Sequence, residues 1–423
     1  MAPKNRIIID TDPGIDDILA ILLALAADAE DLEVLLLSIT YGNVSVDKTL
    51  KNAVALFHVL DLEMQWREKQ GKPLGFEALR TYKPLVAIGP EHALEEEILK
   101  EDGFHGMDGL HDVHVKQPHL SPADTWKSLF KDGVPSPTDD PSYYKYFTPS
   151  RVPAHKEILR ILKEEPAGSV TICAVGPLTN VAMAAAEDPE TFLRLKELVV
   201  MGGAVDVEGN ITPVAEFNTY ADAVACARVF ALTSPNPAST MPPAPADKSV
   251  FRLPDYPEKL SKQLTVKLFP LDITTPHLLN LGFFTETIKP HLEVGSPLAS
   301  WVNTFMSGTF AKIVTMVGDG SEPGLSLHDP LTVWYAITRD DPRWKLAADA
   351  PEDIRVETSG QWTHGMHIRD RRGRPKPDGV TSWEHPGDEY GWTSLIRGNR
   401  IDRIVDSPGI EDFAPYAMKR LFG

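Results

Sequence analysis

The stretch Ile7-Ile8-Ile9-Asp10-Thr11-Asp12-Pro13-Gly14-Ile15-Asp16-Asp17 places four aspartates directly after an apolar run. Residues 7–9 are typical of a buried strand, and residues 18–27 are rich in helix-forming residues, so the aspartates lie in a strand-to-helix turn. Such a turn lies at the carboxyl edge of a sheet, where open α/β folds bind their ligands. Carboxylates this close together repel one another unless a cation binds them, and oxygen ligands favour Ca²⁺ or Mg²⁺. The turn therefore predicts a metal site.

Helix capping and an EF-hand loop each account for only part of this turn. A carboxylate near a helix N-terminus accepts free N–H groups, but such capping requires one or two aspartates and not four. In an EF-hand loop counted from Asp10, position 6 would be Ile15 rather than glycine, and position 12 would be Ile21 rather than glutamate. A phosphatase with a strand-end Asp-x-Asp nucleophile remains an alternative. The four aspartates therefore predict a metal-dependent hydrolytic site.

The bulk composition predicts a soluble, acidic, globular protein. The chain has 423 residues, of which 42% are hydrophobic and 24% charged, and its formal net charge is −18. Because polyanion binding needs clustered Lys and Arg, this charge argues against nucleic acid or an anionic membrane as partner. Cys173 and Cys226 lie in apolar contexts, which indicates buried free thiols. Residues 1–6 contain no apolar signal segment. This absence and the free thiols together predict a cytoplasmic location.

Strand-like and helical patterns alternate along the chain. We predict strands at 7–9, 34–40, 85–88, 170–175 and 198–201, and helices at 18–27, 49–60, 178–186 and 331–337. This alternation predicts a single α/β domain over residues 1–423, with an open, mainly parallel sheet flanked by helices. Segments 116–151, 233–257 and 369–392 break the rhythm and are rich in proline or polar residues, so we expect surface insertions there.

Four later segments each place polar residues just after an apolar run. They are Thr40-Tyr41-Gly42-Asn43, Ala174-Val175-Gly176-Pro177-Leu178-Thr179-Asn180, Val199-Val200-Met201-Gly202-Gly203 with its continuation to Asn218, and Leu327-His328-Asp329-Pro330. Taken alone, each is also compatible with ordinary local structure. A Gly-Asn pair marks a turn, Thr179, Asn180 or Asp329 can cap a helix, and His328 can be a surface histidine.

The third of these segments is the richest in groups that suit a sugar. Its continuation reads Gly209-Asn210-Ile211-Thr212-Pro213 and then Ala215-Glu216-Phe217-Asn218. Paired glycines after a strand let a ligand approach the backbone closely. Asn210, Glu216 and Asn218 offer the mixed donors and acceptors that sugar hydroxyls require.

Together these segments resemble the inosine–uridine preferring nucleoside hydrolase family. The opening Asp-Thr-Asp-Pro-Gly-Ile-Asp-Asp matches the family signature, and Tyr-Gly-Asn, Gly-Pro-Leu-Thr-Asn, Met-Gly-Gly…Ala-Glu-Phe-Asn and His-Asp-Pro follow in the family's order. The resemblance spans residues 7 to about 335. It implies an open α/β sheet, a Ca²⁺ ion in a narrow pocket, a ribonucleoside substrate, and assembly as a homodimer or homotetramer.

The resemblance also assigns roles to individual residues. The family's metal ligands fall on Asp12, Asp17, Asp329 and the backbone carbonyl of Val175. Its general base falls on Asp12, and the histidine that assists the leaving group falls on His328. Asp10 belongs to the signature and is expected to brace the turn from behind the ligands. The ribose contacts fall on Asp16, Asn43, Met201, Asn210, Glu216 and Asn218.

The chemistry of N-glycosidic cleavage needs these residue types. The transition state resembles an oxocarbenium ion, with water attacking one face of the sugar while the base departs from the other. A metal-bound water has a lowered pKa, and a carboxylate at the same ion can accept its proton. Surrounding carboxylates favour the developing positive charge, and a histidine can protonate or hydrogen-bond the departing base. We therefore expect hydrolysis of ribonucleosides to ribose and free base.

Some points stay open from the sequence. Phe104-His105-Gly106-Met107-Asp108-Gly109 resembles the family's pocket loop only loosely, so His105 is either a substrate contact or an exposed histidine. The class of base, purine or pyrimidine, is not encoded in any motif that we can place. Two rival functions remain: an Mg²⁺-dependent phosphohydrolase with Asp10 or Asp12 as nucleophile, and a nucleoside-binding protein without turnover.

Overall fold

The first strand, β1 (Asn5–Thr11), lies in the middle of the main sheet, and its side chains alternate between two hydrophobic cores. Ile7 and Ile9 belong to one core and Ile8 to the other, as expected for a strand buried on both faces. The computed structural model describes residues 3–95, 103–131, 145–244, 252–317, 322–374 and 387–423.

The main sheet has nine strands in the order β10-β13-β7-β6-β5-β1-β2-β3-β4. All neighbouring pairs are parallel except β10 with β13, so the predicted mainly parallel α/β sheet is confirmed. The other strands of this sheet are β2 (Leu32–Ile39), β3 (Leu85–Ile88), β4 (Thr148–Pro149), β5 (Val170–Ala174), β6 (Glu197–Met201), β7 (Val266–Phe269), β10 (Lys345–Leu346) and β13 (Ile401–Asp406).

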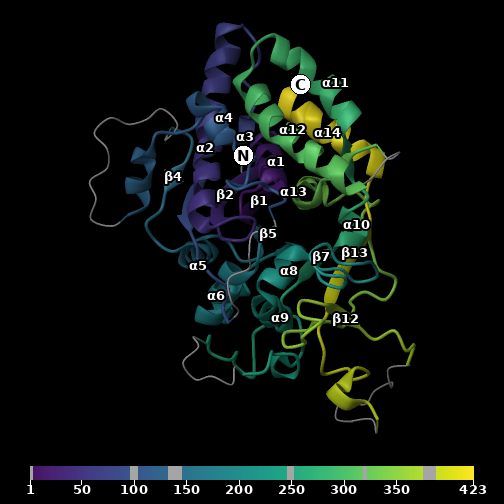
Figure 1. Ribbon diagram of the computed structural model, residues 1–423. Coiled ribbons are helices and arrows are strands. Elements are labelled where there is room, and N and C mark those ends of the chain that lie inside the picture. The colour runs from purple at the N-terminus through teal and green to yellow at the C-terminus, as the bar shows by residue number, and fades with distance from the viewer. Residues whose placement is uncertain (1–2, 96–102, 132–144, 245–251, 318–321, 375–386) are drawn as a thin grey trace.

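Helices cover both faces of this sheet (Figure 1). One face carries α1 (Ile15–Leu25), α2 (Val46–Lys69), α12 (Pro297–Val317), α13 (His328–Thr338) and α14 (Ile410–Phe422). The other carries α5 (Ala154–Glu164), α6 (Thr179–Glu187) and α9 (Ala223–Ala231). The remaining helices are α3 (Glu77–Thr81), α4 (Val113–Lys116), α7 (Pro189–Phe192), α8 (Phe217–Ala221), α10 (Leu271–Thr274) and α11 (Leu281–Glu293).

Two small two-stranded antiparallel sheets lie outside the main sheet. One pairs β8 (Leu278–Asn280) with β9 (Gly324–Ser326), and the other pairs β11 (Ile354–Val356) with β12 (His367–Arg369). All the strands and helices predicted from the sequence are present, with ends shifted by a few residues and with α2 extended in both directions. Within the described residues, none of the helices combines the length and apolarity needed to cross a bilayer.

The three segments expected as insertions lie partly outside the described residues. Segment 116–151 does reach the surface, but it also supplies β4 to the sheet edge and buries Trp126 and Phe147 in the main core. Segment 369–392 begins at the end of β12. The assignment of these segments as insertions on one domain stays a prediction.

Candidate active site

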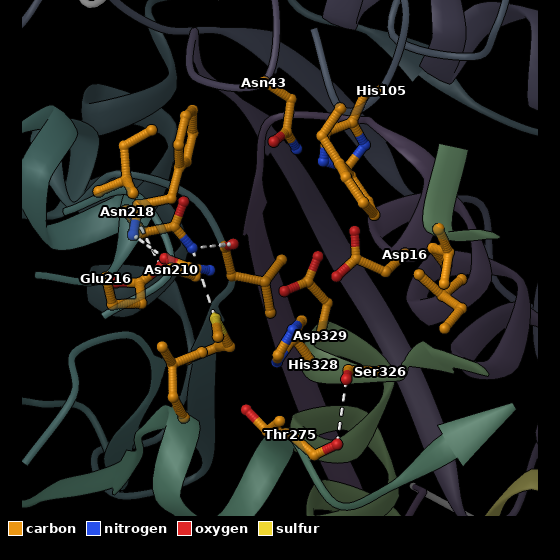
Figure 2. A pocket seen from close by; sticks show the side chains of 18 of the residues that line it. Asp16, Asn43, His105, Asn210, Glu216, Asn218, Thr275, Ser326, His328 and Asp329 are labelled. Carbon is orange, nitrogen blue, oxygen red and sulfur yellow. Dashed lines mark hydrogen bonds between the residues drawn. The ribbon is translucent and has the colours of Figure 1, made fainter. Parts of the chain in front are cut away.

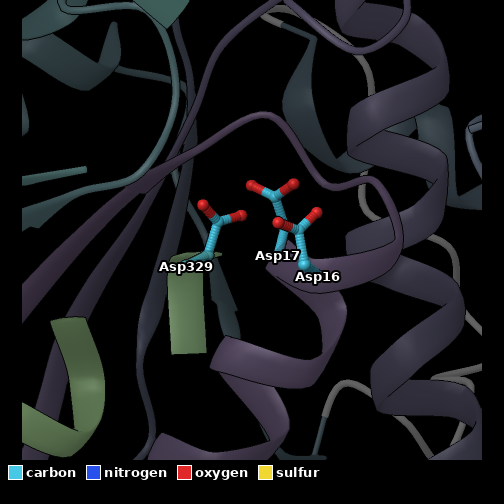
Figure 3. Close-up of side chains that lie close together, drawn as sticks. All are labelled: Asp16, Asp17 and Asp329. Atoms are coloured by element: carbon cyan, nitrogen blue, oxygen red, sulfur yellow. The ribbon is translucent and has the colours of Figure 1, made fainter. Parts of the chain in front are cut away.

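Three carboxylates converge where the first turns of two helices meet. Asp16 and Asp17 lie in the first turn of α1, and Asp329 lies in the first turn of α13, which packs along α1. Figure 3 shows the three side chains pointing toward one another, and one carboxylate oxygen from each lies within 4.8 Å of the other two. Because helix N-termini carry partial positive charge, both turns favour carboxylates at these positions.

The electrostatics of this cluster call for a cation. Burial raises the pKa of Asp329 well above its usual range, and the nearby charges of Asp16, Asp17 and Asp12 raise it further. Burial and the neighbouring Asp17 likewise raise the pKa of Asp16 to about 8. Like charges held together in a buried site are costly unless a cation compensates them. The donor set consists of hard oxygens, so it suits a divalent metal ion such as Ca²⁺ or Mg²⁺.

The acidic turn is held in place by hydrogen bonds to Asp17. Its carboxylate accepts the Thr11 hydroxyl at 2.6 Å and the backbone N–H groups of Asp12 and Gly14 at 3.1 and 3.0 Å. Asn43 at the end of β2 donates to the same carboxylate at 2.9 Å and to the Asp12 carbonyl at 3.1 Å. Asp17 therefore caps α1 and also belongs to the carboxylate cluster.

Asp12 is fully buried and has one oxygen in use and one free. Its Oδ2 accepts the backbone N–H of Asn43 at 2.7 Å, whereas the structure gives Oδ1 no hydrogen-bond partner. Buried polar atoms without a partner are rare in folded proteins, and such an atom beside a carboxylate cluster fits a metal or water ligand. Burial raises the pKa of Asp12 well above its usual range, and the charge of Asp17 adds to the effect.

Asp10 points away from this cluster. Its Oδ1 accepts the Ser38 hydroxyl and, at 2.9 Å, the side-chain amide of Asn180. Asn180 therefore ties α6 to β1 and β2 rather than capping its helix, and Thr179 donates to Asp222 at 2.6 Å. The backbone carbonyl of Asp10 accepts the N–H of Val175 at 2.8 Å, so Asp10 fixes the strand ends that carry other site residues.

A cavity of about 330 Å³ opens beside the carboxylate cluster. Its size suits a small-molecule ligand. Figure 2 shows polar side chains from widely separated segments pointing into this space. Nine of the residues that the sequence assigned to the site line the cavity: Asp16, Asn43, Val175, Met201, Asn210, Glu216, Asn218, His328 and Asp329.

The predicted sugar-binding segment is organised by Glu216. Its carboxylate accepts three backbone N–H groups: Asn218 at 2.7 Å, Gly203 at 2.8 Å and Thr219 at 3.0 Å. It therefore caps the short helix α8 and fastens the turn after β6 to it. The amide of Asn218 donates to the Val175 carbonyl at 2.8 Å, which joins the end of β5 to α8 at the cavity.

The turn at Gly203 rests on a histidine that no sequence motif revealed. Gly203 has a φ of +82°, and a Cβ atom there would lie 2.0 Å from the ring of His367. His367 starts β12 and is almost completely buried. Burial lowers its pKa to about 4, so the ring is neutral near pH 7. The hairpin β11–β12 thus supports the cavity wall from behind.

Gly203→Ala is expected to destabilise the fold by about 3 kcal/mol, because an alanine there is strained by the positive φ and also collides with a buried ring. Gly168→Ala is the matched control: Gly168 has a φ of +76°, but nothing lies within 4 Å of a Cβ atom there. Urea unfolding should show a loss of only about 1 kcal/mol for this control. Equal losses in the two variants would contradict the role given to His367.

His328 is half-buried at the start of α13 and lines the cavity, so it is not a surface histidine. Its Nδ1 lies 2.7 Å from the hydroxyl of Thr274 in α10. Burial lowers the pKa of the ring to about 4, which favours the neutral form. When the Thr274 hydroxyl donates to Nδ1, the hydrogen resides on Nε2 and can be donated to a ligand.

The remaining wall of the cavity is largely apolar and was not predicted. It comes from the loop before α4, from positions 211 and 217, from the C-terminal half of α12, from α10 with the residue after it, and from β9. Three of these positions, 104, 211 and 217, lie inside the quoted motif segments without having been assigned to the site, and no local pattern marks the others, which come together only through packing of distant elements. They are Phe104, Ile211, Phe217, Leu271, Thr275, Ile313, Met316, Gly324, Leu325 and Ser326. His105 also lines the cavity and is buried, so it is not an exposed loop histidine.

The sequence and the structure group the carboxylates differently. Of the predicted metal ligands, Asp17 and Asp329 lie in the cluster, whose third member is Asp16, a predicted ribose contact. Asp12 is adjacent to Asp17, whose Oδ1 accepts its backbone N–H. The Val175 carbonyl faces Asn218.

Comparison with known proteins decides the class of this site. A family model described as inosine-uridine preferring nucleoside hydrolase matches residues 7–388. The chain belongs to this family. Membership in the nucleoside hydrolase family makes the protein a hydrolase of N-glycosyl compounds, and it argues against the phosphohydrolase alternative. The family and the buried acidic cluster together indicate a metal-dependent enzyme.

Individual relatives agree with this membership. The non-specific ribonucleoside hydrolase RihC of Klebsiella pneumoniae is 28% identical over 369 residues, which cover 87% of this chain and 89% of the relative. Among solved structures, a purine-preferring ribonucleoside hydrolase from Gardnerella vaginalis gives a TM-score of 0.65 at 20% identity, covering 99% of this chain and 98% of its own. A plant nucleoside hydrolase gives 0.64 at 23% identity and covers all of both chains. These structures confirm the predicted fold.

Proposed function

We propose that this nucleoside hydrolase cleaves the N-glycosidic bond of purine or pyrimidine ribonucleosides in a Ca²⁺-dependent reaction. The observation that carries the proposal is the convergence of Asp16, Asp17 and Asp329 beside a cavity that Asp16 and Asp329 line and whose other residues suit a sugar and a flat apolar base. The relatives named above act on ribonucleosides, which supports the same substrate class here.

The metal would be held by Asp12, Asp17, Asp329 and the Val175 carbonyl, with Asp16 beside them. When bound, Ca²⁺ lowers the pKa of a coordinated water and orients it, and it can also contact ribose hydroxyls. Ca²⁺ is the better fit than Mg²⁺ because this donor set offers several protein oxygens, whereas Mg²⁺ keeps several waters and is usually bound by only one or two carboxylates.

Asp12 would accept the proton of the attacking water. Its Oδ2 is fixed by the Asn43 N–H, and its Oδ1 has no partner within the described structure, so it can take a further bond. A general base must lie within hydrogen-bond reach of its proton, which a rigid carboxylate beside the metal cluster satisfies.

The ribose would bind between the acidic turn and the α8 segment. Asp16 and Asn43 line one side of the cavity, and Met201, Asn210, Glu216 and Asn218 line the other. Fixed carboxylates on both sides would stabilise the positive charge that develops on the sugar ring. The apolar wall, with Phe104 and Ile313, would receive the base.

His328 would assist departure of the base by donating a hydrogen bond from Nε2, since its lowered pKa leaves the ring neutral. We expect His328→Gln to lower kcat on inosine by about 100-fold, because loss of one placed donor to developing charge costs about 10²–10³. On p-nitrophenyl riboside, whose leaving group needs no proton, the loss should be less than about fivefold. His277→Gln is the control, since His277 is buried with both ring nitrogens paired, to Ile273 and Ser407. Equal losses on the two substrates would show that His328 acts in some other way.

The test of this function is direct. Purified protein with Ca²⁺ is incubated with inosine, guanosine, adenosine, uridine and cytidine, and free ribose and free base are quantified. Release of both in equal amounts from at least one nucleoside is the expected result, and the panel ranks the bases. Measurable nucleoside binding by calorimetry without release of ribose would instead identify a binding protein. Assembly as a homo-oligomer and a cytoplasmic location stay predictions from the sequence.

A further inference from the structure

The loop from Gly103 to Asp112 brings Phe104 and His105 to the cavity without regular secondary structure. Five of its residues have positive φ, at Gly103, Gly106, Gly109, His111 and Asp112, with values between 52° and 85°. Left-handed conformations at His111 and Asp112 are costly for residues with a Cβ atom, so surrounding contacts must impose them. Bonds within the loop contribute to this, since the Asp108 carboxylate accepts the N–H groups of Leu110 and Asp112, and bonds to neighbouring segments fix where the loop lies.

One such bond comes from the acidic turn itself. The backbone N–H of Ile15 donates to Nδ1 of His105 at 3.0 Å. This nitrogen is therefore unprotonated, and the hydrogen of the neutral ring lies on Nε2. This bond holds only the first half of the loop, and it leaves residues 106–112 unattached to the acidic turn.

Asn52 on α2 supplies the second attachment. Its side-chain nitrogen donates to the Pro13 carbonyl at 2.8 Å and to the Asp108 carbonyl at 3.0 Å. One fully buried amide thus bonds to the acidic turn with one hydrogen and to the loop with the other. Both carbonyls lie in segments without helical or strand pairing, so no regular backbone ladder replaces these bonds.

A second layer fixes the orientation of this amide. Nε2 of His114 lies 2.8 Å from Oδ1 of Asn52, and Nδ1 of His114 lies 2.9 Å from the Ser121 hydroxyl. Because the Asn52 nitrogen donates to two carbonyls, its oxygen must accept, so His114 donates from Nε2. All polar atoms of the Asn52 amide are then satisfied in one arrangement only.

Close packing at Gly109 points to the same contact. A Cβ atom at Gly109 would lie 2.7 Å from the Asn52 nitrogen and 3.5 Å from the Pro13 carbonyl oxygen. The loop therefore approaches the turn so closely that only glycine fits between them. The acidic turn, in contrast, keeps the bonds to Thr11, Gly14 and Asn43 described above, whatever happens at Asn52.

We propose that Asn52 is a positioning residue that holds the Phe104–His105 loop against the metal-binding turn and so completes the substrate cavity. This inference rests on the proposed function. It predicts that loss of Asn52 weakens substrate binding while leaving the metal site and the chemical step nearly intact. The turn keeps its own hydrogen bonds, whereas the bonds within the loop, such as those from the N–H groups of Leu110 and Asp112 to the Asp108 carboxylate, do not attach its second half to the turn.

The test compares Asn52→Leu with Asn399→Leu, a matched buried asparagine that donates to the Ile354 carbonyl and accepts from Thr240. For Asn52→Leu we expect KM for inosine to rise about tenfold, the order expected for two lost hydrogen bonds, while kcat and the Kd for Ca²⁺ change less than about threefold. Asn399→Leu should leave KM unchanged. Asn52→Ser, whose hydroxyl can donate to one carbonyl only, should lie between, and it replaces Asn52→Leu if that variant does not fold.

Hydrogen–deuterium exchange of peptides from residues 103–112 provides the readout that does not depend on turnover. Faster exchange there in the Asn52 variants than in Asn399→Leu supports the proposal. Unchanged exchange, or a fall in kcat at constant KM, overturns it. If the wild-type protein releases no ribose from any nucleoside, the proposed function fails, and the exchange comparison still decides the role of Asn52.

Discussion

Asp12→Asn is expected to lower kcat for nucleoside hydrolysis by about 10³-fold while the protein stays folded, since loss of a general base costs 10²–10⁴. The amide has the shape of the carboxylate and can still accept the Asn43 N–H through its oxygen. It cannot accept a proton from water. Steady-state kinetics on the best nucleoside, with circular dichroism to verify folding, measure the effect.

The control for this variant is Asp61→Asn. Asp61 is a buried carboxylate on α2 whose side chain accepts from Gln65 at 2.6 Å, outside the cavity. It should keep kcat within about twofold of wild type, since neither its charge nor its bonds reach the site. Near-normal turnover by a folded Asp12→Asn protein would mean that another group accepts the proton.

Asp329→Asn is expected to weaken Ca²⁺ binding by more than about 100-fold, which is the upper end of the cost of losing an outer-sphere partner of a metal. Asp329 is the only member of the cluster that does not come from the acidic turn, so its carboxylate closes the site from the side of α13. Calorimetric titration of Ca²⁺ into chelator-treated protein measures the change.

The same titration on Asp61→Asn serves as the reference for Asp329→Asn. At saturating Ca²⁺, Asp329→Asn should recover part of its turnover if Asp12 remains competent as base. Unchanged affinity in Asp329→Asn would place the metal elsewhere, and the cluster of Asp16, Asp17 and Asp329 would then have a role other than metal binding.

Much of the fold was predictable because its signals are local. The apolar run at residues 7–9 and its abrupt end in aspartates predicted both β1 and the turn that follows it. The same logic placed Asn43 and Val175 at the ends of two further strands, β2 and β5, and parallel strands bring such ends to one edge of the sheet. The motif segments could therefore be expected to meet around one pocket, and they do.

The grouping within the site was less predictable. Whether Asp12 or Asp16 shares the cluster with Asp329 depends on the rotation of α1 against α13, which no spacing in the sequence specifies. The resemblance assigned Asp12 to the metal and Asp16 to the ribose, and these assignments stay proposals. The free Oδ1 of Asp12 is compatible with them.

The residues that hold the site in place from behind were not predicted, because they come from distant segments of the sequence. His367 packs on Gly203 although more than 160 residues separate them in the sequence. Asn52 bonds to Asp108 from a helix that was predicted without any site residue. Trp126 and Phe147, from a segment expected on the surface, are buried in the main core. Tertiary packing decided these contacts, and local composition carries little information about it.

The most direct test of the account is ribose release by chelator-treated wild-type protein, measured with inosine before and after addition of Ca²⁺, with Asp329→Asn in parallel. We predict that chelation abolishes release, that Ca²⁺ restores it in the wild type, and that Asp329→Asn needs far more Ca²⁺ for the same effect. Full ribose release that persists after chelation would contradict the proposal that a metal held by these carboxylates drives the reaction.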